Sequence, residues 1–277
     1  MAKILDGKQL ADSIKEKLKE EFKAKKKSHK VLPKLGSIKI GGNGSSRIYA
    51  ASQKKLCSEF EIEYILKEEP KNTTIKRINR IIDKLKRQDV TGIIVQLPLP
   101  KGIDHLDIIN RIGPDKDVEG LHPANIGRLF SGNCGLAPCT PAAVMEILKH
   151  WKIKLYGKEV VIIGHSEIVG KPLSIMLLNE FATVTICHIA TSKRNLLQKH
   201  IEKAEVLISA VGAKGFKIPG KWIKKGAITI DVATKGDIDF ESAKKKASYI
   251  TPVPGGVGPV TNIMLMKNLL ELHKRQG

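Results

Sequence analysis

Hydrophobic positions near the start of the chain repeat with the period of a helix. Apolar side chains recur at every fourth position, at Leu10, Ile14, Leu18 and Phe22. The positions between them are mostly charged, so the pattern predicts an amphipathic helix, with Asp6 as its N-cap. The lysine-rich stretch that follows, residues 23–30, is interpreted as the solvated end of this helix.

The rest of the chain alternates between short apolar runs and longer amphipathic segments. Strands are predicted at 35–41, 61–66, 92–97, 159–164, 183–187, 206–210 and 227–231. Helices are predicted at 46–60, 73–88, 142–150, 171–179, 195–203 and 261–274. The runs at 92–97 and 159–164 are almost continuously apolar, which is typical of strands buried on both faces of a parallel sheet.

This alternation predicts an α/β protein with two lobes and a cleft between them. The first is an N-terminal βα lobe, and the last predicted helix, 261–274, closes the chain. The second, residues 140–259, is a Rossmann-like doubly wound domain. The sequence contains no internal repeat and no low-complexity linker.

The charge balance adds a question about ligands. The chain of 277 residues has 48 Lys and Arg against 28 Asp and Glu, a formal net charge of +20. Such an excess favours polyanionic partners, among them nucleic acid, acidic lipid and small phosphate or carboxylate ligands. No aromatic residue lies within the basic run 23–30 to stack on bases, so no nucleic-acid partner is expected.

The cysteines and the apolar runs concern the compartment. Cys57, Cys134, Cys139 and Cys187 fit no zinc-binding spacing, and four thiols in a chain of this length indicate reduced cysteines. The start of the chain lacks the apolar core of a signal peptide, and no run approaches the ~18 apolar residues of a membrane span. A cytoplasmic protein without membrane contact is expected.

A strand-to-helix turn at residues 164–172 carries the first candidate chemistry. Gly164, Ser166 and Gly170 form a G-x-S-x-x-x-G pattern, placed where a Rossmann fold binds pyrophosphate. The next strand ends without the Asp or Glu that usually binds the ribose of NAD. Basic residues stand there or in the turn instead, namely His165, His188, Lys193 and Arg194. These features favour NADP, with NAD and an ordinary basic surface as the alternatives.

Polar residues in the other lobe suggest a second binding region. Tyr49 and Gln53 share a helix face, and Gln96 follows the apolar strand that begins at Gly92. Asp115, Asp117 and Glu119 form an acidic cluster. Their spacing and the intervening Lys116 do not favour a metal site, so none is expected. The alternative interpretation of Gln96 is that it satisfies loop backbone.

These segments together resemble one family. They include 4–8 (ILDGK), 92–100 (GIIVQLPLP), 114–118 (PDKDV), 138–141 (PCTP), 236–240 (GDIDF) and 251–259 (TPVPGGVGP). In this order they resemble the methylenetetrahydrofolate dehydrogenase/methenyltetrahydrofolate cyclohydrolase family over nearly the whole length. The resemblance implies a homodimer in which the first lobe consists of residues 1–139 together with 260–277. This lobe would bind tetrahydrofolate derivatives, including polyglutamylated ones, and the second lobe would bind NAD(P).

The resemblance also implies roles for individual residues. Tyr49 matches the active-site tyrosine, Gln96 matches the glutamine that supports a catalytic lysine, and Glu119 matches a carboxylate for the pterin amino group. Further substrate-binding positions are Leu97, Pro98, Pro254, Gly255, Gly256 and Val257. The cofactor-binding positions are Gly164, His165, Ser166, Ile189 and Thr234. At Ile189 and Thr234 the family usually carries Ser and Ile.

Departures from the family pattern concern the second of its two reactions. Gln53 stands where the family has the lysine of Tyr-x-x-x-Lys, and Glu119 stands where it has an aspartate. An amide cannot transfer a proton near neutral pH, so the dehydrogenase is expected to persist and the cyclohydrolase to be weak or absent. The loop after Val232 is also shorter than usual.

Two other interpretations remain open. In the first, the chain is an ordinary bifunctional enzyme that reaches Lys54 through a distorted helix, although one helical step turns that residue roughly 100° away from Gln53. In the second, it is a folate- or nucleotide-binding paralogue without turnover.

Overall fold

A computed structural model describes residues 1–28, 32–41, 44–132 and 135–276. His29, Lys30 and Cys134 lie outside the described residues. The chain forms two compact units. The first contains residues 1–14 and 138–264, and the second contains residues 15–137 and 265–277. Residues 1–14 belong to the first unit, because the first strand pairs within the sheet of that unit. The predicted domains, 1–139 with 260–277 and 140–259, stay a prediction.

The first unit is built on a six-stranded sheet in the order β1-β9-β8-β7-β5-β6, and every pairing is parallel. The strands are β1 (Lys3–Ile4), β5 (Glu159–Ile163), β6 (Thr183–Cys187), β7 (Val206–Ser209), β8 (Ile228–Asp231) and β9 (Tyr249–Ile250). From β5 the chain adds β6 on one side and β7 on the other. The strand order therefore reverses between β5 and β7, where open α/β sheets bind their ligands.

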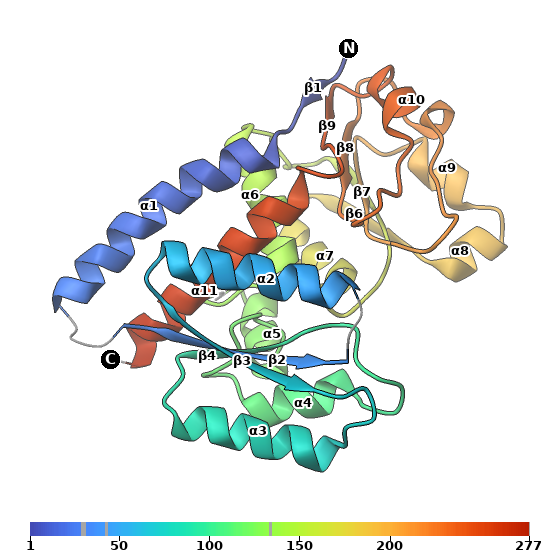
Figure 1. Cartoon of the computed structure of the whole chain (residues 1–277). Helices are drawn as coiled ribbons and strands as arrows, with labels where there is room; N and C mark the ends of the chain where they lie inside the picture. Colours follow the sequence, from blue (N-terminus) through green and yellow to red (C-terminus); the bar gives the residue numbers. More distant parts are fainter. Residues whose placement is uncertain (29–31, 42–43, 133–134, 277) are drawn as a thin grey trace. The chain divides into compact units, whose positions relative to one another are not determined.

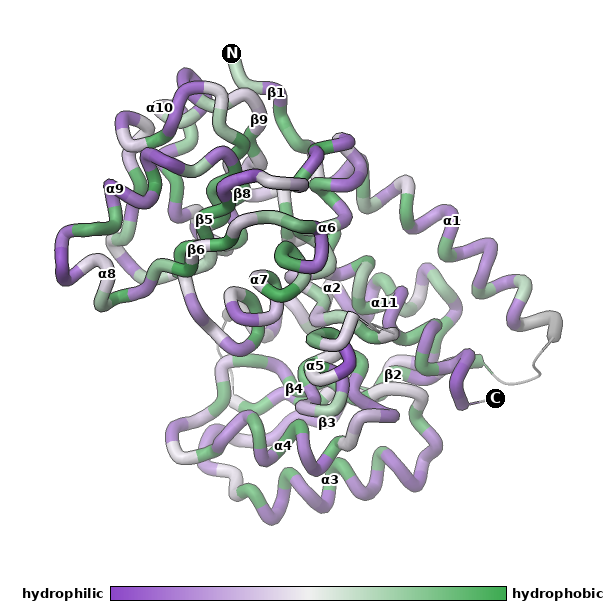
Figure 2. Tube along the Cα trace, turned by 180° about the vertical axis from the view of Figure 1, so that it is seen from behind, coloured by the Kyte–Doolittle hydropathy of each residue, from purple (hydrophilic) through white to green (hydrophobic). Residues whose placement is uncertain are grey.

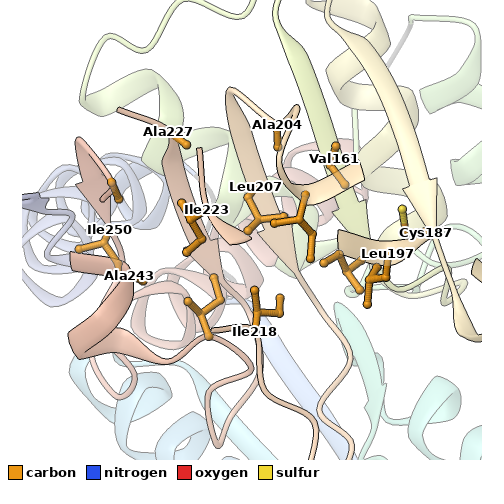
Figure 3. Close-up of a cluster of buried hydrophobic side chains, with 14 of the residues drawn as sticks. Val161, Cys187, Leu197, Ala204, Leu207, Ile218, Ile223, Ala227, Ala243 and Ile250 are labelled. Carbon is orange, nitrogen blue, oxygen red and sulfur yellow. The ribbon is translucent and has the colours of Figure 1, made fainter. Parts of the chain in front are cut away.

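Helices and a 3-10 turn accompany this sheet (Figure 1). They are α6 (Cys139–His150), α7 (Gly170–Asn179), α8 (Ile189–Lys193), α9 (Leu197–Ile201), η1 (Gly220–Trp222) and α10 (Phe240–Lys244). Buried aliphatic side chains of the strands, including Val161 and Leu207, pack with Leu197, Ile218 and Ala243 in one cluster (Figure 3). This core holds the strand ends, and the loops that follow them, in fixed positions.

The second unit has a three-stranded parallel sheet in the order β3-β2-β4. The strands are β2 (Lys34–Ile40), β3 (Glu63–Glu69) and β4 (Gly92–Val95), and the helices are α2 (Gly44–Glu59), α3 (Ile75–Arg87), α4 (His105–Ile112) and α5 (Pro123–Phe130). Figure 1 shows α2 on one side of this sheet and α3 with α4 on the other. Isoleucines of α3 and α4 pack on β2 and β4, among them the fully buried Ile78, Ile82 and Ile108.

Two long helices contribute residues to both units. They are α1 (Gly7–Ser28) and α11 (Val257–Gln276). The predicted N-cap of α1 is confirmed, because Asp6 Oδ1 accepts hydrogen bonds from the backbone N–H of Lys8 (2.9 Å) and Gln9 (3.0 Å). Figure 2 shows the two hydropathy patterns, with β5 mostly hydrophobic and α1 alternating between hydrophilic and hydrophobic positions.

The predicted α/β class with a Rossmann-like domain is confirmed, but the shortest elements escaped prediction. The structure adds the short elements β1, α4, α5, α8, η1, α10 and β9. The predicted helix at 195–203 is reduced to α9, and α11 begins four residues before the predicted start at 261. Elements of two to eight residues span too few periods for a hydrophobic pattern to stand out.

Candidate functional site

A buried cluster of three polar side chains lies at the end of β4 in the second unit. The amide nitrogen of Gln96 donates hydrogen bonds to Ser37 Oγ (3.0 Å) and to Gln53 Oε1 (2.7 Å). All three residues are buried. The amide nitrogen carries two protons, and each forms one of these two bonds. The bonds therefore define the orientations of both amides. The cluster holds polar groups in place but contains no group that titrates near neutral pH.

The helix α2 supplies Tyr49 and Gln53 one turn apart. Tyr49 is half-buried, and burial raises the pKa of its phenol. Lys54, the lysine needed by the distorted-helix interpretation, follows Gln53 in the continuous helix and is exposed. The buried position one turn after Tyr49 is therefore occupied by an amide.

Two carboxylates follow a short stretch that runs beside β4. Asp117 forms a parallel bridge with Ile93, so Glu119 lies two residues further toward the strand end that carries Gln96. Asp117 Oδ2 accepts from the backbone N–H of His122 (2.7 Å) and from Asn125 Nδ2 (2.9 Å). Within the described part of the chain, the buried Glu119 Oε2 has no hydrogen-bond partner. Burial, followed by the charge of Asp117, raises the pKa of Glu119 to about 8.

The raised pKa of Glu119 predicts a pH dependence of stability. The folded protein binds this proton more tightly than the unfolded chain, so stability is expected to fall as pH rises from about 4.5 to about 8. Glu119→Gln is expected to remove this part of the slope. Urea unfolding at about pH 6 and about pH 8.5 measures the difference. An unchanged slope in the variant would contradict the assignment, and Asp115→Asn, at an exposed carboxylate, is the control.

Leu97 and Pro98 follow Gln96 in the loop after β4. Leu97 is half-buried and Pro98 is exposed, and the peptide bond between them is cis. These two residues leave the sheet directly beside the buried Gln96.

In the first unit, the predicted turn after β5 lies at the reversal of strand order. Gly164 has φ +117°, and a Cβ there would lie 2.6 Å from the carbonyl oxygen of Ala210, which follows β7. A Cβ on Gly170 would collide with the carbonyl oxygen of Gly164. The turn therefore requires glycine at both positions, and it leads into α7, which has no side-chain cap at its start. Lys171 donates its N–H to the carbonyl oxygen of Ser166 (3.0 Å) and Pro172 has no N–H, so among the first three residues of α7 it is Gly170 that can offer an N–H to a phosphate.

Exposed histidines follow the ends of β5 and β6. The rings of His165 and His188 lie 5.2 Å apart, and both side chains are exposed. His188 Nδ1 accepts from the N–H of Ala190 (3.2 Å), which caps α8, and Ile189 is 67% exposed. A pyrophosphate at α7 and a 2′-phosphate beside the two histidines suit these residues, since no carboxylate stands between Cys187 and Arg194. The site therefore fits NADP.

A pair of buried aspartates, which the sequence analysis missed, organises the loops after β7 and β8. Asp237 accepts from Ser209 Oγ (2.8 Å) and from the N–H of Val211 (2.7 Å) and Gly212 (3.0 Å). Asp231 Oδ2 accepts from the N–H of Asp237 (2.7 Å). Thr234, a predicted cofactor contact, is exposed within the loop that this pair holds. The carboxylate of Asp231 at the end of an apolar strand was the available signal.

The predicted loop before α11 also contains a close backbone approach. The N–H of Lys8 donates to the carbonyl oxygen of Gly255 (3.1 Å), and a Cβ on Gly256 would lie 2.6 Å from the carbonyl oxygen of Pro252. Pro254 is exposed and Val257 is buried. The loop therefore has a defined shape that depends on glycine at position 256.

Ser37 is a second residue that the sequence analysis missed. It is fully buried in the middle of β2 and accepts a hydrogen bond from Gln96. A small polar residue inside an otherwise apolar strand was the signal that could have identified it.

The described residues lack two features, a metal cluster and a membrane-spanning helix. No group of three or more His, Cys, Asp or Glu side chains is arranged to hold a metal ion. Within the same residues, no helix combines the length and the apolar character needed to cross a membrane.

The parallel sheet, its reversal point and the glycine turn at that point define a Rossmann-like nucleotide-binding protein of the α/β class. Comparisons with known proteins narrow this class. Residues 5–119 match the catalytic domain of the tetrahydrofolate dehydrogenase/cyclohydrolase family, and residues 138–277 match its NAD(P)-binding domain. The chain therefore belongs to the tetrahydrofolate dehydrogenase/cyclohydrolase family.

Three relatives illustrate the similarity. The bifunctional protein FolD of Acetivibrio thermocellus is 46% identical over 100% of this chain and 98% of its own. The crystal structure of bifunctional FolD from Campylobacter jejuni is 41% identical, with a TM-score of 0.92 and full coverage of both chains. That of Trypanosoma brucei FolD, complexed with NADP and an inhibitor, is 36% identical, with a TM-score of 0.94 and coverage of 99% and 98%.

Proposed function

We propose that this protein oxidises 5,10-methylenetetrahydrofolate to 5,10-methenyltetrahydrofolate with NADP as the electron acceptor. Family membership and the NADP-bound relative support the activity and the cofactor. In the reaction, one C–H bond of the methylene bridge breaks and its hydrogen leaves with both electrons. When bound, the nicotinamide supplies the acceptor for that hydride. The protein's own contribution is positioning, which needs no titrating residue.

The proposed substrate contacts lie in two groups of residues. In the second unit, Tyr49, Gln96, Leu97 and Pro98 line the folate, and Glu119 Oε2 accepts hydrogen bonds from the pterin amino group. Its burial without a partner among the described residues supports this role, because such an oxygen gains most from a donor that a ligand brings. In the first unit, residues 254–257 contact the pterin side.

NADP is proposed to bind through the turn Gly164–Ser166 and through Ile189 and Thr234. Ile189→Asp is expected to raise the KM for NADP about 10- to 100-fold, since a carboxylate repels the 2′-phosphate and accepts from a free ribose hydroxyl. The KM for NAD should fall or stay unchanged. Initial rates with each coenzyme measure the ratio. Thr183→Asp makes the same charge change at the opposite end of β6, and an equal shift there would refute the contact.

The hydrolytic reaction separates two candidates. Water adds to the methenyl carbon, a C–N bond opens to give 10-formyltetrahydrofolate, and protons must move between water and nitrogen. The Gln96–Gln53 hydrogen bond is the observation that favours a dehydrogenase with weak or absent cyclohydrolase, because an amide occupies the position of the family lysine. The names of the relatives favour the ordinary bifunctional enzyme instead. This alternative is therefore better supported than the loss of the cyclohydrolase.

One assay distinguishes these candidates and the paralogue without turnover. The purified protein is given methylenetetrahydrofolate and NADP, and NADPH formation is followed; the decay of added methenyltetrahydrofolate is measured separately. NADPH formation with decay at the uncatalysed rate supports the dehydrogenase alone. Rapid decay makes the protein bifunctional, and ligand binding without NADPH formation makes it a non-catalytic paralogue.

The remaining parts of the proposal concern assembly and location. A homodimer and folates with several glutamyl residues are proposed from the family resemblance. A cytoplasmic location is proposed from the cysteines, since Cys57, Cys139 and Cys187 are buried and none of the three forms a disulfide.

A further inference from the structure

The first unit contains a cavity of about 590 Å³ that the proposed reaction does not use. It lies beyond the carboxyl ends of β8 and β9, and its lining includes the apolar side chains of Ile238, Ile250 and Val253. This volume falls within the ~300–1,000 Å³ of typical small-molecule sites. The cavity is therefore large enough for a ligand rather than for water alone.

Two aromatic side chains also line this cavity. Trp222 belongs to η1 and Phe240 begins α10, and both side chains are half-buried. Both residues pack against the hydrophobic cluster of this unit, which limits the movement of their rings. Fixed aromatic rings at the wall of a cavity favour a planar apolar group in the ligand.

The charged groups of the cavity favour a negative ligand. Lys217, Lys221 and Lys235 are exposed and contribute three ammonium groups. Lys217 Nζ donates to the carbonyl oxygen of Gly236 (2.7 Å). Throughout the described chain, no hydrogen bond or ion pair occupies the ammonium groups of Lys221 and Lys235. Two ammonium groups at the cavity are thus free to bind an anion.

The two carboxylates of the lining do not offset this preference. The oxygens of Asp231 already accept from the N–H groups of Ala233 (3.1 Å), Asp237 (2.7 Å) and Ile238 (2.8 Å), so they do not offer a cation site. Asp239 is exposed. Three ammonium groups against two carboxylates leave the lining with a net positive charge.

The cavity is distinct from the proposed nucleotide turn. That turn follows β5, where the strand order reverses toward β7, whereas the cavity lies at β8 and β9 on the far side of β7. The proposed NADP contact Thr234 precedes the lining residue Lys235 in the chain but does not itself line the cavity. None of the residues proposed to contact NADP or folate lines it. A ligand there would be an additional one.

We propose that this cavity binds a small aromatic anion, with a planar ring against Trp222 and Phe240 and a phosphate or carboxylate group at Lys221 and Lys235. The ring supplies the apolar contact and the lysines select the charge. Neither a neutral ring nor an inorganic anion alone satisfies both parts of the lining.

Tryptophan fluorescence tests the proposal, because the chain has only two tryptophans. In the full-length Trp151→Phe protein, Trp222 is the sole reporter. Titration with phenyl phosphate is expected to change its emission saturably, whereas benzyl alcohol and inorganic phosphate bind at least about tenfold more weakly. Benzoate in place of phenyl phosphate tells a carboxylate from a phosphate ligand.

Matched variants identify the site of binding. Lys221→Met with Lys235→Met is expected to raise the Kd about tenfold or more, while Lys224→Met with Lys225→Met, an equal charge loss outside the cavity, leaves it unchanged. Saturating NADP should not displace the probe. The proposal is overturned by the lack of a saturable change up to about 10 mM, by equal effects of the two pairs, or by displacement with NADP. Melting curves show that each variant is folded.

Discussion

Gln53→Lys is expected to increase the hydrolysis of methenyltetrahydrofolate by about 10²-fold or more, the lower end of what a positioned acid or base contributes. The side chain at position 53 is buried beside Gln96, so an ammonium group there would be partly desolvated and its pKa lowered toward neutrality. Hydride transfer to NADP should change much less, since it depends on positioning. The measurement compares methenyl decay with NADPH formation in one preparation.

The control for this substitution lies one residue away. Lys54→Gln removes an exposed lysine and is expected to leave both rates within about twofold. A wild-type protein that hydrolyses its substrate rapidly, and that gains nothing from Gln53→Lys, would show that another group moves the proton. The ordinary bifunctional alternative would then hold without a lysine at position 53.

Asp237→Ala is expected to lower the free energy of unfolding by about 2–3 kcal/mol, because it leaves one buried and two partly buried donors without an acceptor. These donors are Ser209 Oγ and the N–H groups of Val211 and Gly212. The loops after β7 and β8 should loosen, so NADP binding should weaken as well. Urea unfolding measures the first effect and a coenzyme titration the second.

A neighbouring aspartate provides the comparison. Asp239 is exposed, so Asp239→Ala is expected to cost less than about 1 kcal/mol. If both variants lowered the free energy of unfolding equally, the hydrogen bonds of Asp237 would contribute little to stability. Asp237→Asn keeps one acceptor and should fall between them.

The long elements of the fold were predictable because their hydrophobic positions follow one pattern over several helical turns or over a whole strand. Examples are the apolar run of β5 and the apolar side chains at every fourth position of α1. Elements such as α8 and β9 were not predictable, since five or two residues do not complete a pattern. Their conformation depends on contacts with distant parts of the chain, which a local pattern does not contain.

The sequence indicated parts of the candidate site where the backbone conformation requires glycine. Gly164 and Gly170 could be identified because their carbonyl contacts exclude a Cβ. The contact between Gln96 and Gln53 joins residues 43 positions apart, and nothing local signals it. The raised pKa of Glu119 likewise depends on burial, which the spacing of acidic residues cannot reveal.

The continuity of α1 and α11 has a consequence for protein engineering. The assignment of residues to units changes at 14/15, 137/138 and 264/265, and two of these junctions fall inside helices. Exchanging the nucleotide-binding unit for that of a relative therefore means splicing two helices in register as well as joining one loop. A shift of one residue at either splice would rotate every later side chain of that helix by about 100° and bury the wrong face. In chimaeras of this protein, each splice should therefore preserve the rotational position of the residues in α1 and α11.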